Sequence, residues 1–338
     1  MSASYTVDDL LPKIQENIDA MDYPMAYAFC EKAVALAPND IRILELLGQV
    51  EIELEKFPEA RQHFLQAVQQ QPDTGYSKYM YLGQLSVEKE AIAAFQQGVN
   101  LMMAERQHAS MDQDAAQLLA EKIATALCSM TEIYLTDCCF EPEAEQKCEE
   151  YLQQAQQVDP TNAEVYQLLA SVRLSQQRNE EAAQILEQSI GFWIEKEVGD
   201  PTIPNYDSRL ALVKLLLEVG MVQHTFMVLE RLQKENDQVV DLWYLYGWAY
   251  YCMGEDETNQ QQEEDRLTHW EDARDCLELA LKLSKVTGYD DEALLEHAKE
   301  LIASINTVVP PSAPEEDVVV LPEDEADYES DGDDAMEM

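Results

Sequence analysis

The chain has 338 residues, more than one compact core usually holds, which leaves either several domains or one elongated array of repeats. Its 67 acidic residues against 22 Lys and Arg give a formal net charge of -45, which repels the phosphates of nucleic acids and of anionic membranes. The charge favours a basic protein as partner. With only 11 Gly and 13 Pro, the composition favours helices over the many turns of a β-protein.

A sequence period of 34 residues appears in the first part of the chain. Pro38 and Pro72 are separated by that interval, and each closes a stretch with small residues at matching offsets, for example Ala26 and Ala60. This period is typical of the tetratricopeptide repeat, a hairpin of two antiparallel helices. Small residues let the two helices approach closely, and large apolar residues fill the space between one hairpin and the next.

The same pattern recurs near the C-terminal end. Trp243, Tyr246, Gly247 and Tyr250 occupy the expected large and small positions of a first helix. An acidic, Gln-rich stretch at 255–268 then delays the second helix and is predicted to be an inserted loop. Further units are predicted to start near Tyr76, Ala124, Ala163 and Tyr206.

These repeats predict an all-α protein. We expect a right-handed superhelical solenoid of about seven tetratricopeptide repeats plus a capping helix, together covering residues 1–308. The capping helix is predicted at 290–307, where apolar residues recur on one helical face. Residues 309–338 contain no Lys or Arg and many acids, so they are predicted to form a disordered acidic tail.

The seven cysteines and the first residues suggest a compartment. The cysteines are odd in number, are scattered through helical segments and form no Cys-x-x-Cys pair, which indicates free thiols in a reducing environment. The N-terminal residues lack the basic and then apolar pattern of a signal peptide. We therefore expect the protein in the cytoplasm and the nucleus.

No sequence motif of an enzyme is found. The chain has no Gly-rich phosphate loop, no Gly-x-Ser-x-Gly elbow and no His-Glu-x-x-His zinc signature. The five His residues are far apart, and none has a second His or Cys at metal-ligand spacing. We expect a protein that is not an enzyme, has no cofactor and holds no metal.

The repeat register predicts which residues face the concave side of the solenoid. It places several acids there, with Arg42 and Lys214 as the only bases. The plain alternative for these acids is a solvated helix face. The acids predicted to bind a partner are Glu45, Glu88, Glu132, Glu164, Asp207 and Asp241.

Three further aromatic residues of the last repeat, Tyr244, Trp248 and Tyr251, are assigned to the same surface. One interpretation is a platform on which Arg and Lys side chains of a partner stack. The other is that these rings pack under the acidic insertion or the capping helix, as aromatic residues more often do.

The chain lacks the clamp by which many tetratricopeptide co-chaperones bind acidic tails of heat-shock proteins. Those co-chaperones carry Lys and Asn at two fixed positions, one helical turn apart. At these positions the first three repeats carry Leu11 and Gln15, Glu45 and Gln49, and Met80 and Gln84. A basic, extended ligand matches the predicted surface better.

Four features together resemble a known family. They are the repeat number, the aromatic run at 243–254, the acidic insertion after it and the acidic tail Glu-Asp-Glu-Ala-Asp-Tyr-Glu-Ser-Asp-Gly-Asp-Asp. The chain is similar to the fungal chaperones dedicated to the large-subunit ribosomal protein L-four. The resemblance implies binding of the newly made basic protein through its long internal loop and delivery to pre-ribosomes.

Two other functions remain open from the sequence. One is a general tetratricopeptide scaffold or adaptor in a multiprotein complex, and the other is a heat-shock co-chaperone. Under the favoured interpretation the partner is one basic ribosomal protein, bound one-to-one by a monomer, with no direct contact to nucleic acid or membrane.

Overall fold

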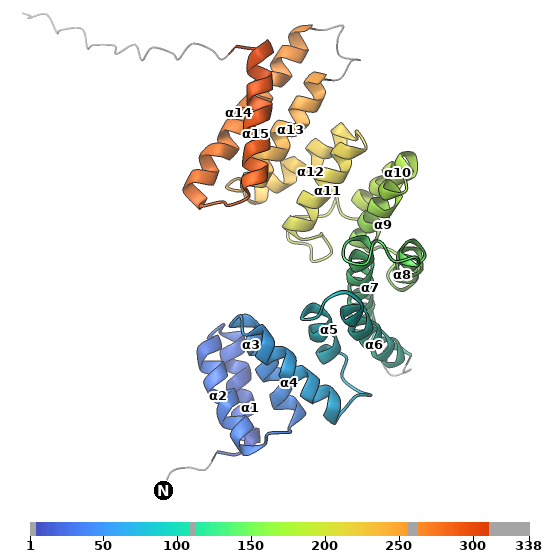
Figure 1. Ribbon diagram of the computed structural model, residues 1–338, viewed down its shortest axis with the longest axis vertical. Helices are drawn as coiled ribbons and strands as arrows, with labels where there is room; N and C mark the ends of the chain where they lie inside the picture. The colour runs from blue at the N-terminus through green and yellow to red at the C-terminus, as the bar shows by residue number, and fades with distance from the viewer. Residues whose placement is uncertain (1–4, 108–111, 256–262, 311–338) are drawn as a thin grey trace, which may run out of the picture. The chain divides into compact units, whose positions relative to one another are not determined.

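The computed structural model describes residues 5–107, 112–255 and 263–310. Over these ranges the protein consists of fifteen α-helices and no strand (Figure 1). None of these helices is both long and apolar enough to cross a membrane. The chain forms two compact units, residues 1–237 and 238–338, and each is described by itself.

The first unit contains six helix hairpins in chain order. Its helices are α1 (Val7–Asp19), α2 (Tyr23–Leu36), α3 (Ile41–Glu53), α4 (Phe57–Gln70), α5 (Ser77–Gln84), α6 (Glu88–Arg106), α7 (Gln113–Leu135), α8 (Ala144–Val158), α9 (Ala163–Ser175), α10 (Asn179–Gly191), α11 (Tyr206–Glu218) and α12 (Val222–Glu235).

The second unit contains one hairpin and a final helix. Helix α13 (Val240–Glu255) pairs with α14 (Glu263–Thr287), and α15 (Glu292–Val308) packs on both. The described helices therefore form seven hairpins and one last helix, which confirms the all-α repeat fold, its repeat number and the capping helix. The right-handed path of the whole array stays a prediction.

Close helix approach depends on glycine, as the repeat pattern predicts. A Cβ added at Gly48 of α3 would lie 2.7 Å from ring carbons of the fully buried Phe64 on α4. A Cβ at Gly247 of α13 would lie 2.5 Å from Leu277 of α14. Both distances are shorter than non-bonded carbon atoms tolerate, so only glycine permits this spacing of the two helices.

A left-handed residue marks the turn inside most hairpins. The turns of the first, second and fifth hairpins contain Met21, Glu55 and Gln177, with φ of 57°, 59° and 61°. In the third hairpin Glu88, the first residue of α6, has a φ of 50°. In the sixth hairpin the left-handed residue is Gly220, with a φ of 74°. Except at Glu88, the left-handed residue directly follows the C-cap of the first helix, ends that helix and reverses the chain within a few residues.

The ends of the predicted domains differ from the observed elements. Glu255 is the last residue of α13 and α14 begins at Glu263, so both ends of the predicted loop are helical; residues 256–262 lie outside the described residues. Val309 is 7% exposed, and its carbonyl accepts a hydrogen bond of 3.0 Å from the buried Arg274. Val309 therefore belongs to the folded unit. Of the rest of the predicted tail, Pro310 is exposed and residues 311–338 lie outside the described residues.

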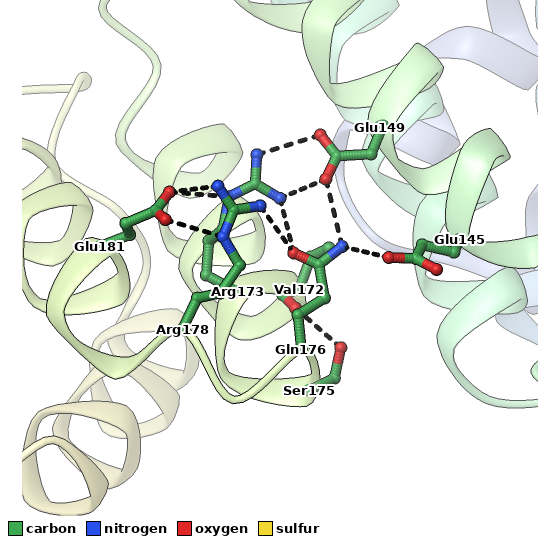
Figure 2. Close-up of polar contacts among 8 residues, drawn as sticks. All are labelled: Glu145, Glu149, Val172, Arg173, Ser175, Gln176, Arg178 and Glu181. Carbon is green, nitrogen blue, oxygen red and sulfur yellow. Dashed lines mark hydrogen bonds and ion pairs between the residues drawn. The ribbon is translucent and has the colours of Figure 1, made fainter.

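A polar network fixes the fifth hairpin to the preceding helix (Figure 2). Arg173, near the end of α9, donates to both carboxylate oxygens of Glu149 on α8, one of them at 3.0 Å. The Gln176 amide donates to Glu145 and Glu149 at 2.9 and 3.2 Å. Arg178 and Glu181 form an ion pair across the turn into α10. Glu149 and Glu181 are therefore neutralised by arginine within the fold, whereas Glu145 is bound by the neutral amide of Gln176.

We predict that Gly48→Ala destabilises the protein. Overpacking against Phe64 costs about 1–3 kcal/mol, more than the ~1 kcal/mol that Ala gains over Gly inside a helix. Gly191→Ala is the matched control, because Gly191 has no neighbouring atom within 4 Å of the added Cβ and ends α10. Urea unfolding followed by circular dichroism measures both. Equal stability of the two variants would contradict the proposed close approach.

Candidate protein-binding groove

Three adjoining hollows lie along the first helices of successive hairpins in the first unit. One of about 440 Å³ lies between α5 and α7, and one of about 530 Å³ is lined by α7, α9 and α11. A third, of about 380 Å³, lies between α7, the start of α9 and the segment before α11. Thr125 borders all three, so they form one continuous depression, here called the groove.

The elements that line the groove are those that the repeat register predicts. Helices α5, α7, α9 and α11 are the first helices of the third to sixth hairpins. The segment 192–205 adds a wall that no repeat supplies. Trp193 is fully buried, and its ring lies 5.9 and 5.7 Å from the guanidinium carbons of Arg209 and Arg231. Arg231 also donates to the carbonyls of Ile194 and Lys196. These contacts hold the wall in place.

The groove contains both acids and lysines. Its acids are Glu121, Glu132, Asp159 and Glu164, and its lysines are Lys122, Lys196 and Lys214. The expectation that Lys214 would be the only inward base along this stretch was wrong.

The two additional lysines come from parts of the chain that the repeat register leaves out. Helix α7 begins eleven residues before the predicted start at Ala124, which brings Lys122 into the groove. Lys196 lies in the segment between α10 and α11. Lys122 donates to the Tyr76 hydroxyl at 3.0 Å and Lys196 donates to Thr202.

Glu132 and Glu164 are brought together by α7 and α9. Both line the same hollow, and Glu164 accepts a 2.6 Å hydrogen bond from the Ser208 hydroxyl on α11. Within the described part of the chain no cation lies at ion-pair distance from either carboxylate. Glu132 is exposed at the border of the hollow, and desolvation by the surrounding walls, followed by the charge of Glu164, raises its pKa.

The carboxyl pKa of Glu149, an acid outside the groove, shifts in the opposite direction. Arg173 lowers the pKa of Glu149, because its hydrogen bonds stabilise the charged carboxylate. Glu132 has no such partner and is destabilised as an anion. A carboxylate held unpaired in a hollow beside another one attracts a cationic group from outside. The pair Glu132 and Glu164 is therefore the best candidate cation site in the first unit.

Glu45 is not available to a partner in the way we expected. Its carboxylate lies 3.6 Å from the ammonium group of Lys78, whose side chain is 1% exposed. Lys78 also donates to the carbonyl of Thr74. A buried ammonium group needs an anion beside it, so Glu45 compensates a charge of the fold.

Glu88 and Asp207 do not line the groove. Helix α5 ends at Gln84, so Glu88 lies beyond the first helix of its hairpin, exposed at the first residue of α6. The placement of Glu88 on the concave face was wrong, because that face requires the first helix to continue to this residue. Asp207 is exposed in the first turn of α11 and does not border any of the hollows.

The predicted residues of the second unit pack around α15. Tyr244 is 7% exposed, and its hydroxyl lies 2.8 Å from Nδ1 of His297 on α15. Trp248 meets the His297 ring edge-on with centroids 6.0 Å apart, and the Tyr251 hydroxyl lies 3.3 Å from the Ser304 hydroxyl. The stacking platform was the wrong interpretation for Tyr244, whose ring is covered by the capping helix.

Asp241 has a role inside the second unit. It accepts a hydrogen bond from the hydroxyl of Tyr289, and burial, followed by this hydrogen bond, raises the pKa of Tyr289. Asp241 thus has a hydrogen-bond partner within the second unit.

Comparison with known proteins places this arrangement in a family. Residues 163–192, which are α9, the turn and α10, match the model of the tetratricopeptide repeat. A protein of Schizosaccharomyces pombe described as a probable assembly chaperone of rpl4 is 36% identical over 96% of both chains. One of Emericella nidulans with the same description is 32% identical over 82% of this chain and 74% of the relative.

The chain belongs to the family of rpl4 assembly chaperones. A solved structure of the assembly chaperone of RpL4 (Acl4) superimposes with a TM-score of 0.69 and 32% identity, over 76% of this chain and 100% of that one. A tetratricopeptide repeat protein of Parabacteroides merdae, 15% identical with a TM-score of 0.55, covers 88% of this chain and shares the fold.

The sequence prediction missed the apolar end of the groove. The hollow between α5 and α7 is bordered by Tyr76, Met80 and Tyr81 on one helix and by Leu118 on the other. The signal was present in the spacing of Tyr76, Met80 and Tyr81, which repeats as one face of a helix does. Leu118 could not be assigned, because the predicted unit began after it.

No metal centre is indicated by the described residues. They contain no group of three His, Cys, Asp or Glu side chains placed as ligands of one ion. The seven cysteines are all free. Burial raises the pKa of Cys30 to about 12, which keeps this thiol protonated and unreactive at neutral pH.

We predict that Glu132→Gln raises the melting temperature of the free protein at neutral pH. A raised carboxyl pKa means that the charged form costs stability above that pKa, and the neutral amide removes this cost. The gain disappears below the ordinary glutamate pKa, where Glu132 is protonated in both the folded and the unfolded state. Scanning calorimetry at neutral and acid pH tests this, with the exposed Glu180→Gln as control. A gain that persists at acid pH would show another cause.

Proposed function

We propose that this chain is an assembly chaperone that binds the newly made ribosomal protein rpl4 and protects it until the protein joins the pre-ribosome. Family membership supports the identity of the client, since the curated relatives are described as assembly chaperones of rpl4. The observation that carries the mechanism is the unpaired carboxylates Glu132 and Glu164 in a continuous groove. Such a surface attracts an extended cationic segment.

The mechanism is stoichiometric binding. Before assembly, a ribosomal protein exposes basic segments that are built to contact RNA, and these segments aggregate when unshielded. The groove covers one such segment and offers carboxylates to its Lys or Arg side chains. Ribosomal RNA, a denser polyanion, then competes for the same side chains and releases the client. We infer a monomer that binds one client and accompanies it from the cytoplasm into the nucleus.

The heat-shock co-chaperone is disfavoured by the described groove. Such a function needs a cationic surface to hold an acidic tail, and here the lysines of the groove lie among four carboxylates that repel one, those of Glu121, Glu132, Asp159 and Glu164. The salt dependence of partner binding distinguishes the general scaffold from the chaperone. The affinity of a groove for neutral helices is insensitive to ionic strength, whereas an affinity that depends on ion pairs falls as salt is raised.

The central test is charge reversal in the groove. We predict that Glu132→Lys with Glu164→Lys lowers the affinity for purified rpl4 at least about tenfold, because two attractions become repulsions. The double variant also reduces the salt dependence of binding. Isothermal titration calorimetry at two salt concentrations measures both. The control is Glu31→Lys with Glu180→Lys, two exposed acids that lie outside the groove and change the net charge equally.

Equal loss of affinity in the groove variant and the control would show that net charge alone attracts the client. Recovery of many unrelated proteins, instead of rpl4, with the affinity-purified chain would contradict a dedicated chaperone.

Binding should also depend on pH. A client cation beside Glu132 stabilises its carboxylate, so binding lowers the raised pKa of Glu132 and releases a proton. The affinity for rpl4 is therefore expected to fall as pH is lowered from about 7 toward 5, the range just above the ordinary glutamate pKa. Glu132→Gln should flatten this dependence. An unchanged pH profile in the variant would remove Glu132 from the binding site.

A further inference from the structure

The groove contains an apolar pocket that the electrostatic mechanism does not use. This anchor pocket is the hollow of about 440 Å³ between α5 and α7. Its apolar border consists of Tyr76, Met80, Tyr81, Phe95 and Leu118, and Leu118 is 53% exposed. The rest of its border is largely polar and includes Glu121 and Lys122. A hollow of this size that combines apolar walls with a few polar groups is typical of a binding site.

The walls of the anchor pocket are held rigidly. Tyr81 stacks on the buried Phe64 of α4 with ring centroids 4.9 Å apart, and Met80 packs against Gly98 of α6. The hydroxyl of Tyr76 accepts a hydrogen bond from Lys122 of α7. These contacts from α4, α6 and α7 fix the aromatic side of the pocket before any ligand arrives, which reduces the entropy lost on binding.

The anchor pocket is continuous with the cation site. Thr125 and Ser129 of α7 border both the anchor pocket and the hollow that contains Glu132 and Glu164. A single extended chain that lies along α7 therefore meets an apolar pocket at one end and two carboxylates at the other. This continuity identifies the occupant as a chain with both kinds of side chain.

We propose that the client segment places a large apolar side chain in the anchor pocket and, a few residues away, an Arg or Lys side chain between Glu132 and Glu164. The proposal rests on the proposed function. From Lys122 at the pocket to Glu132 is ten residues of α7, about 15 Å at 1.5 Å per residue. An extended peptide covers that distance in roughly four or five residues.

This arrangement explains how the groove selects one client among many basic proteins. Carboxylates alone attract any cationic chain, and the attraction is weakened by salt. An apolar anchor at a fixed distance from a cation adds a requirement that a uniformly basic segment does not meet. Lys214, exposed in the same hollow as the two carboxylates, further repels such a segment.

The first test compares two exposed apolar residues of the full chain. Leu118→Glu places a charge at the mouth of the anchor pocket, and Met227→Glu makes the same change on α12, outside the groove. We expect Leu118→Glu to weaken binding of purified rpl4 at least about tenfold, because burial of one large apolar side chain contributes about that much affinity. Met227→Glu should leave the affinity unchanged. Equal affinities would overturn the proposal.

If circular dichroism shows that Leu118→Glu does not fold, the milder Leu118→Ala replaces it. We expect Leu118→Ala to weaken binding of rpl4 several-fold. Unchanged affinity in a folded Leu118→Ala variant would also overturn the proposal. The outcomes distinguish failure of the proposed function from failure of the anchor pocket alone. If the wild-type chain does not bind rpl4, the proposed function fails, and the inference fails with it. If the wild-type chain binds and the folded variants bind equally well, only the anchor pocket fails.

The second test identifies the occupant directly. Leu118 is replaced by the photo-reactive benzoyl-phenylalanine in the full chain, which is then mixed with rpl4 and irradiated. We expect mass spectrometry to find the cross-link at or beside an apolar residue of rpl4 that has an Arg or Lys roughly four or five residues away. A cross-link confined to a stretch without an apolar residue, or no cross-link in a complex that forms, would overturn the proposal.

Discussion

The close approach of paired helices is the constraint on which the rest of the structure depends. Gly48 against Phe64 and Gly247 against Leu277 show the same solution in both compact units: a residue without a side chain faces a large apolar one. A hairpin built in this way has no core of its own, so neighbouring hairpins must stack to bury its apolar faces. The stacked first helices then form a surface of their own, and the groove lies on it.

Electrostatics divides the acids of this chain into two groups. Glu149 is paired with arginine and Glu45 with a buried lysine, so the fold itself neutralises them. Glu132 and Glu164 have no cation at ion-pair distance among the described residues, and the pKa of Glu132 is raised. Charge left uncompensated in a hollow is unfavourable for the free protein and favourable once a cationic partner binds. The acids most useful for recognition are therefore those that stabilise the fold least.

Recognition in this groove combines two physical forces with different ranges. Carboxylates attract a cationic chain from a distance and are screened by salt, whereas an apolar pocket acts only at contact and is insensitive to salt. Three lysines, Lys122, Lys196 and Lys214, line the groove together with the carboxylates, so the groove is not uniformly acidic. A surface of this mixed character distinguishes a particular basic segment from basic proteins in general.

The sequence by itself determined the repeat, the helix pairs, their number and the glycine contacts, because these depend on residues close together along the chain. It also indicated Glu132 and Glu164, since the register of a repeat fixes which residues share a face. Only the tertiary structure decided what those faces meet. The pairing of Glu45 with Lys78 and the cover of α15 over Tyr244 join residues 33 and 53 positions apart. Lys122, Lys196 and Leu118 entered the groove from segments without the repeat pattern, which no local periodicity predicts.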